Sequence, residues 1–264
     1  MKRATPLEVI LKRDRVVVMA GILGIAALAW AYTVYLAWAM ENTMTSLGTG
    51  VFMSQTSPWG AIEFVLMFVM WTVMMVAMMV PTAAPMILVF ATVSRRRQEQ
   101  KRPFVPTGIF LAGYVVIWSA FSLLATLVNW GLHMGGLLSS MMGHATPVVG
   151  GLLLIAAGIF QWSRLKYVCL AHCRSPIGFL MSEWQEGAKG ALSMGLRHGM
   201  FCLGCCWVLM TLLFVLGVMN LLWIAALAVF VLIEKVAPAG HWVGRFTGLL
   251  LVLWGAWTIV GVFT

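Results

Sequence analysis

The chain has 264 residues, of which 62% are hydrophobic and only 9% are charged, and its mean hydropathy is +0.96. Soluble domains carry roughly a quarter charged residues, so this composition excludes an ordinary soluble protein and predicts one that crosses a membrane several times. The formal net charge of +9 does not indicate a nucleic-acid partner, because the basic residues flank apolar stretches instead of gathering in a polar domain.

Seven apolar stretches, each a candidate membrane helix, follow one another along the chain. The first follows a basic N-terminal segment and has no A-x-A-like cleavage site after it, so we expect it to be retained. No polar segment between the stretches is long enough for a soluble domain, so residues 1–264 are predicted to form one integral membrane domain, an all-α polytopic transmembrane helical bundle. The seven predicted membrane helices cover residues 16–38, 62–93, 108–127, 147–162, 194–217, 221–233 and 243–263. Six helices are the alternative, because only a Met219-Asn220 turn separates the fifth from the short sixth.

The 17 lysines and arginines fall on alternate sides of successive predicted helices. Basic residues concentrate on the cytoplasmic side of membrane helices. The N-terminus is therefore expected in the cytoplasm and the C-terminus outside.

The second predicted helix is rich in methionine and contains Pro81 and Pro85. Proline frees backbone carbonyls, which a membrane tolerates only inside a bundle, so this helix is expected to be central. Methionine can bind soft metals, but it is also a common filler of helix packing, and packing is the favoured interpretation here. Further soft side chains fall in the two predicted outward loops, namely Met40, Met44, Met53, His133, Met134, Met141, Met142 and His144.

The connection between the fourth and fifth helices, residues 163–193, mixes apolar with charged side chains and predicts an interfacial cytoplasmic helix. It contains the motif C-L-A-H-C, with Cys169, His172 and Cys173. Because both ends of the connection are tied to the same face of the membrane, we expect this motif to approach the fifth helix.

The densest group of potential ligands lies at the expected start of that fifth helix, in the sequence MGLRHGMFCLGCCWVLM. On a helix, its histidine and three cysteines lie within about 100° of one face. All five cysteines of the chain fall between residues 169 and 206, with two histidines interleaved. Cysteines that served only as small buried hydrophobic residues would not need to be grouped in this way. We therefore predict a cytoplasmic-side metal site drawn from His198, Cys202, Cys205, Cys206, Cys169, His172 and Cys173.

Thiolate and thioether ligands select soft ions, so Cu(I) is the predicted metal, with zinc or iron as alternatives. Cysteine on the inside and methionine on the outside also suits a reducing cytosol and an oxidising exterior. The rival hypothesis is a membrane thiol-disulfide oxidoreductase that passes electrons between the pair Cys169 and Cys173 and the pair Cys202 and Cys205. The interleaved histidines and Cys206 favour the metal.

Other polar residues have ordinary explanations. Glu63 and the neighbours Glu234 and Lys235 are expected near water, where topology or a local ion pair explains them. The sequence has no phosphate-binding loop, Ser/His/Asp arrangement or paired carboxylates, so no catalytic residues are assigned and an enzyme is not expected.

Five long motifs carry a resemblance to a known family: AMMVPTAAPM (77–86), GYVVIWSAFS (113–122), CLAHCRSPIGF (169–179), GLRHGMFCLGCCWVLM (195–210), and GVMNLLWIAAL through EK (217–235). In these the chain resembles a bacterial family of unknown biochemical role, described as predicted metal-binding integral membrane proteins. The resemblance implies a membrane location and metal binding. With the residues above, it leads us to expect a bacterial inner-membrane protein that handles Cu(I), by translocation or by delivery to a membrane cuproenzyme. Its expected partners are the lipid bilayer, the metal ion, and a metallochaperone or such a cuproenzyme.

Overall fold

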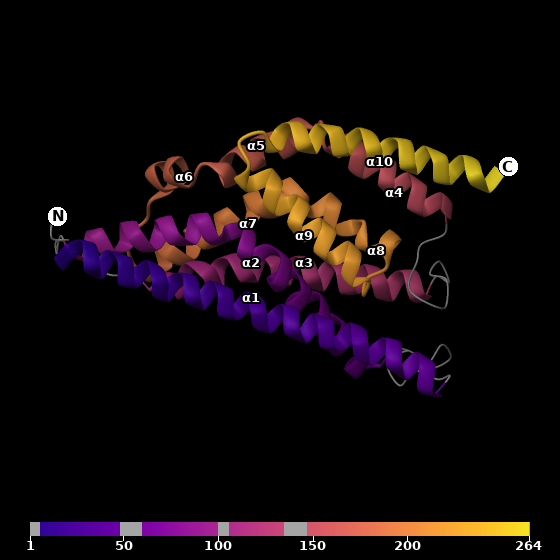
Figure 1. The fold of residues 1–264 in the computed structure, drawn as a ribbon, viewed down its shortest axis with the longest axis horizontal. Coiled ribbons are helices and arrows are strands. Elements are labelled where there is room, and N and C mark those ends of the chain that lie inside the picture. The colour runs from indigo at the N-terminus through magenta and orange to yellow at the C-terminus, as the bar shows by residue number, and fades with distance from the viewer. Residues whose placement is uncertain (1–5, 48–59, 100–105, 135–146, 264) are drawn as a thin grey trace.

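A computed structural model describes residues 6–47, 60–99, 106–134 and 147–263, and every regular element among them is an α-helix. Figure 1 shows these helices in an elongated bundle. They are α1 (Pro6–Leu47), α2 (Ala61–Glu99), α3 (Thr107–Met134), α4 (Pro147–Phe160), α5 (Arg164–Arg174), α6 (Pro176–Glu183), α7 (Gly187–Thr211), α8 (Leu213–Leu216), α9 (Leu221–Val236) and α10 (Gly240–Phe263). The predicted all-α class is confirmed.

Five segments of the described chain are long and apolar enough to cross a membrane. These segments are Val16–Ala39, Ala61–Arg97, Thr107–Leu132, Gly187–Leu216 and Gly240–Val262. The pair α4 and α5, bent by 62° at its break, would add a sixth. The expected sixth helix corresponds to α9, whose 16 residues span about 24 Å, short of the ~30 Å hydrocarbon layer.

The region before the cysteines differs from the sequence-based expectation. Instead of one interfacial helix, the structure has α5 and α6, separated at Pro176, whose ring nitrogen cannot continue the hydrogen bonding of α5. The next helix, α7, begins at Gly187 and not at Met194, because the weakly apolar stretch GAKGALS is helical too. His198 and the three following cysteines therefore lie in the middle and C-terminal half of α7, away from the positive end of its helix dipole.

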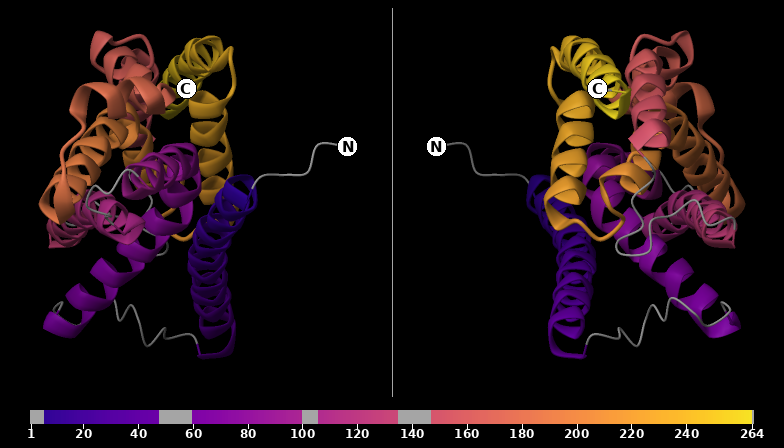
Figure 2. Two further views of the ribbon diagram at one scale, coloured as in Figure 1. Left: turned by 90° about the vertical axis from the view of Figure 1, so that its left-hand side faces the viewer. Right: turned by 90° about the vertical axis from the view of Figure 1, so that its right-hand side faces the viewer.

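The first helix begins at one end of the long axis, and α10 ends at the other (Figure 1). Figure 2 looks along that axis and places α4 and α10 together on one side of the bundle, with α1 on the opposite side. Contacts join α1 to α2, α2 to α3, α3 to α7 and α4 to α10, while α9 packs against α2. The second helix thus contacts α1, α3 and α9, which agrees with the expected central position.

Two of these helix pairs depend on glycine. Gly113 of α3 and Gly195 of α7 face each other so closely that a Cβ on either would strike the backbone of the other helix. Gly158 of α4 and Gly248 of α10 make the same kind of contact. Small residues that let helix backbones approach are typical of membrane helix pairs.

The methionines of α2 mostly fill the core. Five of them are no more than 1% exposed and belong to the main hydrophobic cluster: Met74, Met75, Met78, Met79 and Met86. This burial agrees with the packing interpretation. Of the loop residues singled out above, Met134 is 66% exposed, and the side chains of the others lie outside the described residues.

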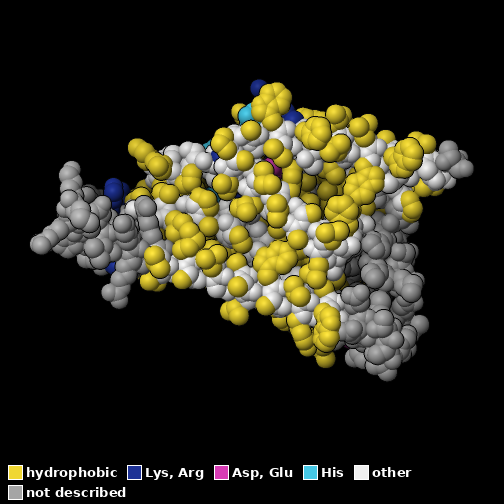
Figure 3. All heavy atoms as spheres, viewed as in Figure 1, with side chains coloured by type: hydrophobic (Ala, Val, Ile, Leu, Met, Phe, Trp, Pro, Cys, Tyr) yellow, Lys and Arg dark blue, Asp and Glu magenta, His cyan; other side chains and the backbone are white. Residues whose placement is uncertain are grey.

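The outer surface is strongly apolar. The face in Figure 3 is covered mainly by hydrophobic side chains, with dark blue lysine and arginine atoms only near its edges. Exposed side chains include Leu28, Met181 and Trp257. A helix bundle surrounded by lipid requires such a surface, whereas soluble monomers rarely expose one this large.

Candidate metal centre

One face of α7 carries the four predicted ligands, and the structure buries all of them. His198, Cys202, Cys205 and Cys206 are each no more than 2% exposed. Their spacing places them on neighbouring turns of one side of the helix. That side faces the interior, where α7 packs against α3 and α5.

A thiol from α5 joins this group. Cys173 lies close to the thiols of Cys202 and Cys205, and Cys206 lies close to the same two. We call Cys173, Cys202, Cys205 and Cys206 the thiol cluster. Two sequence motifs separated by a bent connection therefore meet in space.

The thiol cluster is not a preformed metal-coordination site. No three His, Cys, Asp or Glu side chains among the described residues are arranged so that they could hold a metal ion as they stand. The reason is visible on α7, where the thiols of Cys205 and Cys206 both donate to the carbonyl oxygen of Cys202, at 3.0 and 2.9 Å. These thiols bend back along their own helix, and rotation about χ1 would free them to point elsewhere.

Cys202 has two further polar partners. The ammonium nitrogen of Lys235 in α9 lies 2.9 Å from the Cys202 sulfur, and the hydroxyl of Tyr114 in α3 lies 3.0 Å from it. Lys235 also donates to the Thr82 hydroxyl at 2.9 Å, and Tyr114 to the Met79 carbonyl at 3.0 Å. Cys202 is thus the point where α2, α3, α7 and α9 are linked by polar contacts.

The expectation that Glu234 and Lys235 lie near water is wrong. They are only 2% and 8% exposed, because the short α9 ends inside the bundle. Their side chains point to different partners, since Glu234 forms an ion pair with Lys166 of α5 at 2.7 Å while Lys235 contacts Cys202.

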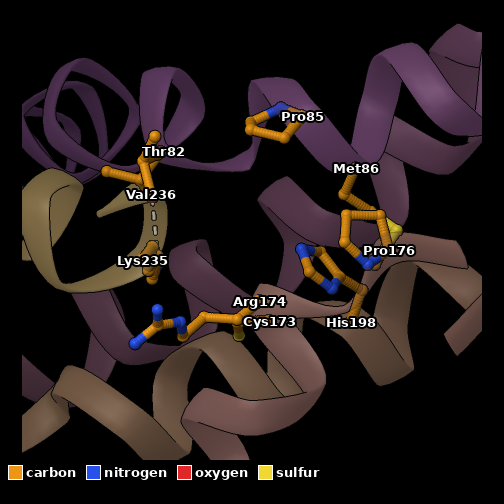
Figure 4. A pocket seen from close by; sticks show the side chains of 9 residues that line it. All are labelled: Thr82, Pro85, Met86, Cys173, Arg174, Pro176, His198, Lys235 and Val236. Atoms are coloured by element: carbon orange, nitrogen blue, oxygen red, sulfur yellow. Dashed lines mark hydrogen bonds between the residues drawn. The ribbon is translucent and has the colours of Figure 1, made fainter. Parts of the chain in front are cut away.

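A pocket of about 160 Å³ lies beside the thiol cluster. In Figure 4, Thr82 and Lys235 are on one side of the pocket, His198 and Met86 are on the other, and Cys173 lies between them. The complete lining is Thr82, Pro85, Met86, Cys173, Arg174, Pro176, His198, Lys235 and Val236. Three different soft or borderline donors, a thioether, a thiol and an imidazole, thus face one small space.

The imidazole of His198 is held by aromatic rings and lacks a polar partner on one nitrogen. Its ring stacks on Phe110 and Tyr114, with centroids 6.0 and 5.7 Å away, and meets Phe179 edge-on. Its Nδ1 atom is buried and makes no hydrogen bond. A buried polar atom of this kind usually has a ligand or water as its partner.

The other two predicted ligands, His172 and Cys169, belong neither to the thiol cluster nor to the pocket lining. His172 stacks on Phe201 with centroids 4.2 Å apart, and its Nδ1 contacts the Val168 carbonyl at 2.9 Å. Cys169 packs against Gly204 of α7. Neither is among the residues around the pocket.

The sequence analysis did not assign four residues that surround the cysteines in the structure. They are Thr82, Met86, Tyr114 and Lys235. A signal was present, because each lies in one of the five motifs quoted above. Residue type gave no such indication, since threonine, methionine and tyrosine are common in apolar helices.

Comparison with known protein families finds a match that covers most of the chain. Residues 68–258, well over half of the chain, match a family described as PpoB2 copper chaperone. The matched range includes every residue of the thiol cluster and of the pocket. No curated protein and no solved structure matches the chain.

Proposed function

The chain belongs to the PpoB2 copper chaperone family and has a copper-handling role, and from that premise we propose that it binds Cu(I) within a membrane at the thiol cluster. The observation that carries this proposal is the proximity of Cys173 to Cys202 and Cys205 beside a pocket lined by His198, whose Nδ1 has no hydrogen-bond partner. Copper is the cargo of such a protein, held and then passed on.

The donor set suits the cuprous ion. Thiolate, thioether and imidazole are soft or borderline ligands, and Cu(I) prefers them to the oxygen ligands that hard ions need. Binding deprotonates the thiols that coordinate the ion. The Cys205 and Cys206 hydrogen bonds to the Cys202 carbonyl are lost whenever those thiols deprotonate, so the same event releases their side chains to turn toward the ion.

The pocket is the route by which the copper ion would reach the thiol cluster. Met86 and His198 line it on one side and Cys173 lies between the walls, whereas Cys202, Cys205 and Cys206 are not part of the lining. An ion entering there meets a thioether and an imidazole first, then Cys173, and through Cys173 the thiols of α7. The exchange partner is a metallochaperone or a membrane cuproenzyme, and the chain either moves copper across the inner membrane or delivers it.

The oxidoreductase alternative has less support. All five cysteines are free, and the Cys205 thiol is hydrogen-bonded to the backbone of its own helix. Residues three apart on a regular helix are poorly placed for a disulfide, which needs close and correctly directed Cβ atoms.

The first prediction is copper content. Protein purified anaerobically from copper-replete cells should contain copper near one equivalent per chain, because one thiol cluster is present. Cys202→Ser should lose most of it, since a serine hydroxyl is a poor ligand for Cu(I). Met74→Leu, in the same core but away from the pocket, is the matched control and should keep it.

Elemental analysis of the three proteins decides the matter. If zinc or iron is found in place of copper, the proposed identity of the metal is wrong. If the unmodified protein holds no metal above background, the proposal is refuted.

A further inference from the structure

Lys235 places a buried ammonium group against the thiol cluster. From this contact we infer that Lys235 is a specificity-determining residue, whose positive charge makes the cluster select a monovalent cuprous ion over a divalent ion such as Zn²⁺. The inference rests on the proposed function, since it concerns the same cluster.

The surroundings of Lys235 explain why its charge acts on the cluster. The ammonium is bound to the Cys202 sulfur and the Thr82 hydroxyl, each at 2.9 Å. Within the described part of the chain no carboxylate forms an ion pair with it, because the adjacent Glu234 is paired with Lys166. A lysine that is 8% exposed needs a compensating negative charge, and the sulfur of Cys202 is the group placed to carry one.

Arg174, the second cation that lines the pocket, has hydrogen-bond partners away from the thiol cluster. Arg174 donates to the carbonyl oxygens of Ala237 and Pro238, at 2.6 and 2.8 Å. Those carbonyls belong to the residues just after α9. Arg174 therefore anchors the end of α9, while Lys235 is the cation that touches sulfur.

The charge balance then depends on the ion. Two thiolates and Cu⁺ carry a net charge of −1, which the ammonium neutralises. Two thiolates and Zn²⁺ are already neutral, so the same ammonium leaves a net charge of +1. In a buried site of low effective dielectric, an uncompensated charge is costly, so the arrangement with Lys235 favours Cu⁺ and disfavours Zn²⁺.

A purely structural role makes a different prediction. If Lys235 only ties α9 to α2 and α7, its loss would loosen the cluster and weaken the binding of both ions together. The ratio of the two affinities separates charge compensation from general support.

The test uses the full-length protein in detergent under anaerobic conditions. The Cu(I) and Zn(II) affinities are measured by competition with chromophoric chelators for the unmodified protein, Lys235→Met and Lys235→Arg. The double variant Lys166→Met/Glu234→Gln is the control, because it removes a buried ammonium on the same part of the fold together with its own counter-ion.

We expect Lys235→Met to lower the ratio of Cu(I) to Zn(II) affinity by about a hundredfold, the size of one charge interaction a few ångströms away at an intermediate dielectric. Lys235→Arg should restore most of the ratio, and the double variant should keep it. An unchanged ratio in Lys235→Met, or equal ratios in Lys235→Met and Lys235→Arg, would overturn the inference while leaving the proposed function in place. A failure of the unmodified protein to bind Cu(I) would overturn the proposed function and the inference with it.

A second measurement needs no variant, in case Lys235→Met does not fold. One ammonium and one Cu⁺ together balance two thiolates, so X-ray absorption of the copper-loaded protein should show two short copper–thiolate distances. Three or more copper–thiolate distances would leave excess negative charge and contradict the inference.

Discussion

His172 and His198 are identical as residues but have different surroundings. His172 is stacked flat on Phe201, and its Nδ1 contacts a backbone carbonyl of the preceding turn. His198 is enclosed by three rings, its Nδ1 has no partner, and it lines the pocket. The sequence placed both in one candidate site, because both stand beside cysteines. Position relative to the pocket, which depends on tertiary structure, separates them.

This difference predicts unequal effects of the same substitution. His198→Gln should lower Cu(I) affinity by about tenfold, the loss of one neutral nitrogen ligand or its hydrogen bond. His172→Gln should leave the affinity unchanged, and it is the matched control. Chelator competition measures the affinities, and X-ray absorption should lose its imidazole signal only in His198→Gln. If the two variants behave alike, His198 is a packing residue.

At the scale of elements, α5 is fastened to α9 at both of its ends. Lys166 in its first turn pairs with Glu234 and also contacts Gln161, and Arg174 in its last turn binds the carbonyls that follow α9. The face between these two anchors carries Cys169 and Cys173. The position of Cys173 over the α7 thiols therefore depends on these polar contacts to α9 as well as on the direct packing of α5 against α7.

The effect of the ion pair between Lys166 and Glu234 on the free energy of unfolding should be large only when one partner is removed and the other is left charged. Lys166→Met alone should destabilise the protein by about 3–5 kcal/mol, because it leaves the Glu234 carboxylate buried without a counter-ion. The double variant Lys166→Met/Glu234→Gln should recover most of this loss, since neither remaining side chain carries a charge. Unfolding of the single and double variants in mixed detergent gives the coupling free energy. Additive losses would mean that the two side chains do not form a working pair.

The sequence predicted the apolar helices well, including the short α4 and α9, and the less apolar segment between α4 and α7 poorly. The long apolar runs of α2, α3 and α10 are defined by hydropathy alone, which is why their predicted ranges lie inside the observed helices. The stretch GAKGALS is helical without being apolar, so hydropathy placed the start of α7 seven residues late. Glu234 and Lys235 were taken for surface residues because sequence shows where α9 stops being apolar but not that neighbouring helices cover its end.

The candidate site shows the same limit. The cysteines could be found from sequence because all five are concentrated between residues 169 and 206 with histidines among them. The contact between Lys235 and Cys202 joins residues 33 positions apart on different helices, and no local pattern predicts it. The orientation of the Cys205 and Cys206 thiols toward the Cys202 carbonyl depends on side-chain rotamers, which a sequence pattern does not specify.

For the molecule as a whole, the positions of the two chain ends bear on the membrane topology. The start of α1 and the end of α10 lie at opposite ends of the long axis, and the end of α2, with its run of arginines, lies near the start of α1 (Figure 1). The expected topology requires these two basic segments to share one end, and the topology itself stays a prediction. It requires that α9 return the chain between α8 and α10, although its 16 residues are fewer than the ~20 of a usual membrane helix.

The topology prediction follows from that geometry. A reporter fused after Arg102 should be cytoplasmic and one fused after Thr264 should be extracytoplasmic, because the chain ends α10 on the side opposite to the basic residues. The position of the second reporter depends on α9. A helix this short can carry the chain across only where the bundle covers its polar end, as it does for Glu234 and Lys235, which find Lys166 and Cys202 as partners inside the protein. Paired reporters that are active on opposite sides of the membrane make the measurement, and a third fusion after Gly143 serves as an extracytoplasmic control. A cytoplasmic C-terminus would mean that α9 does not complete a crossing, and it would remove the seventh predicted membrane helix.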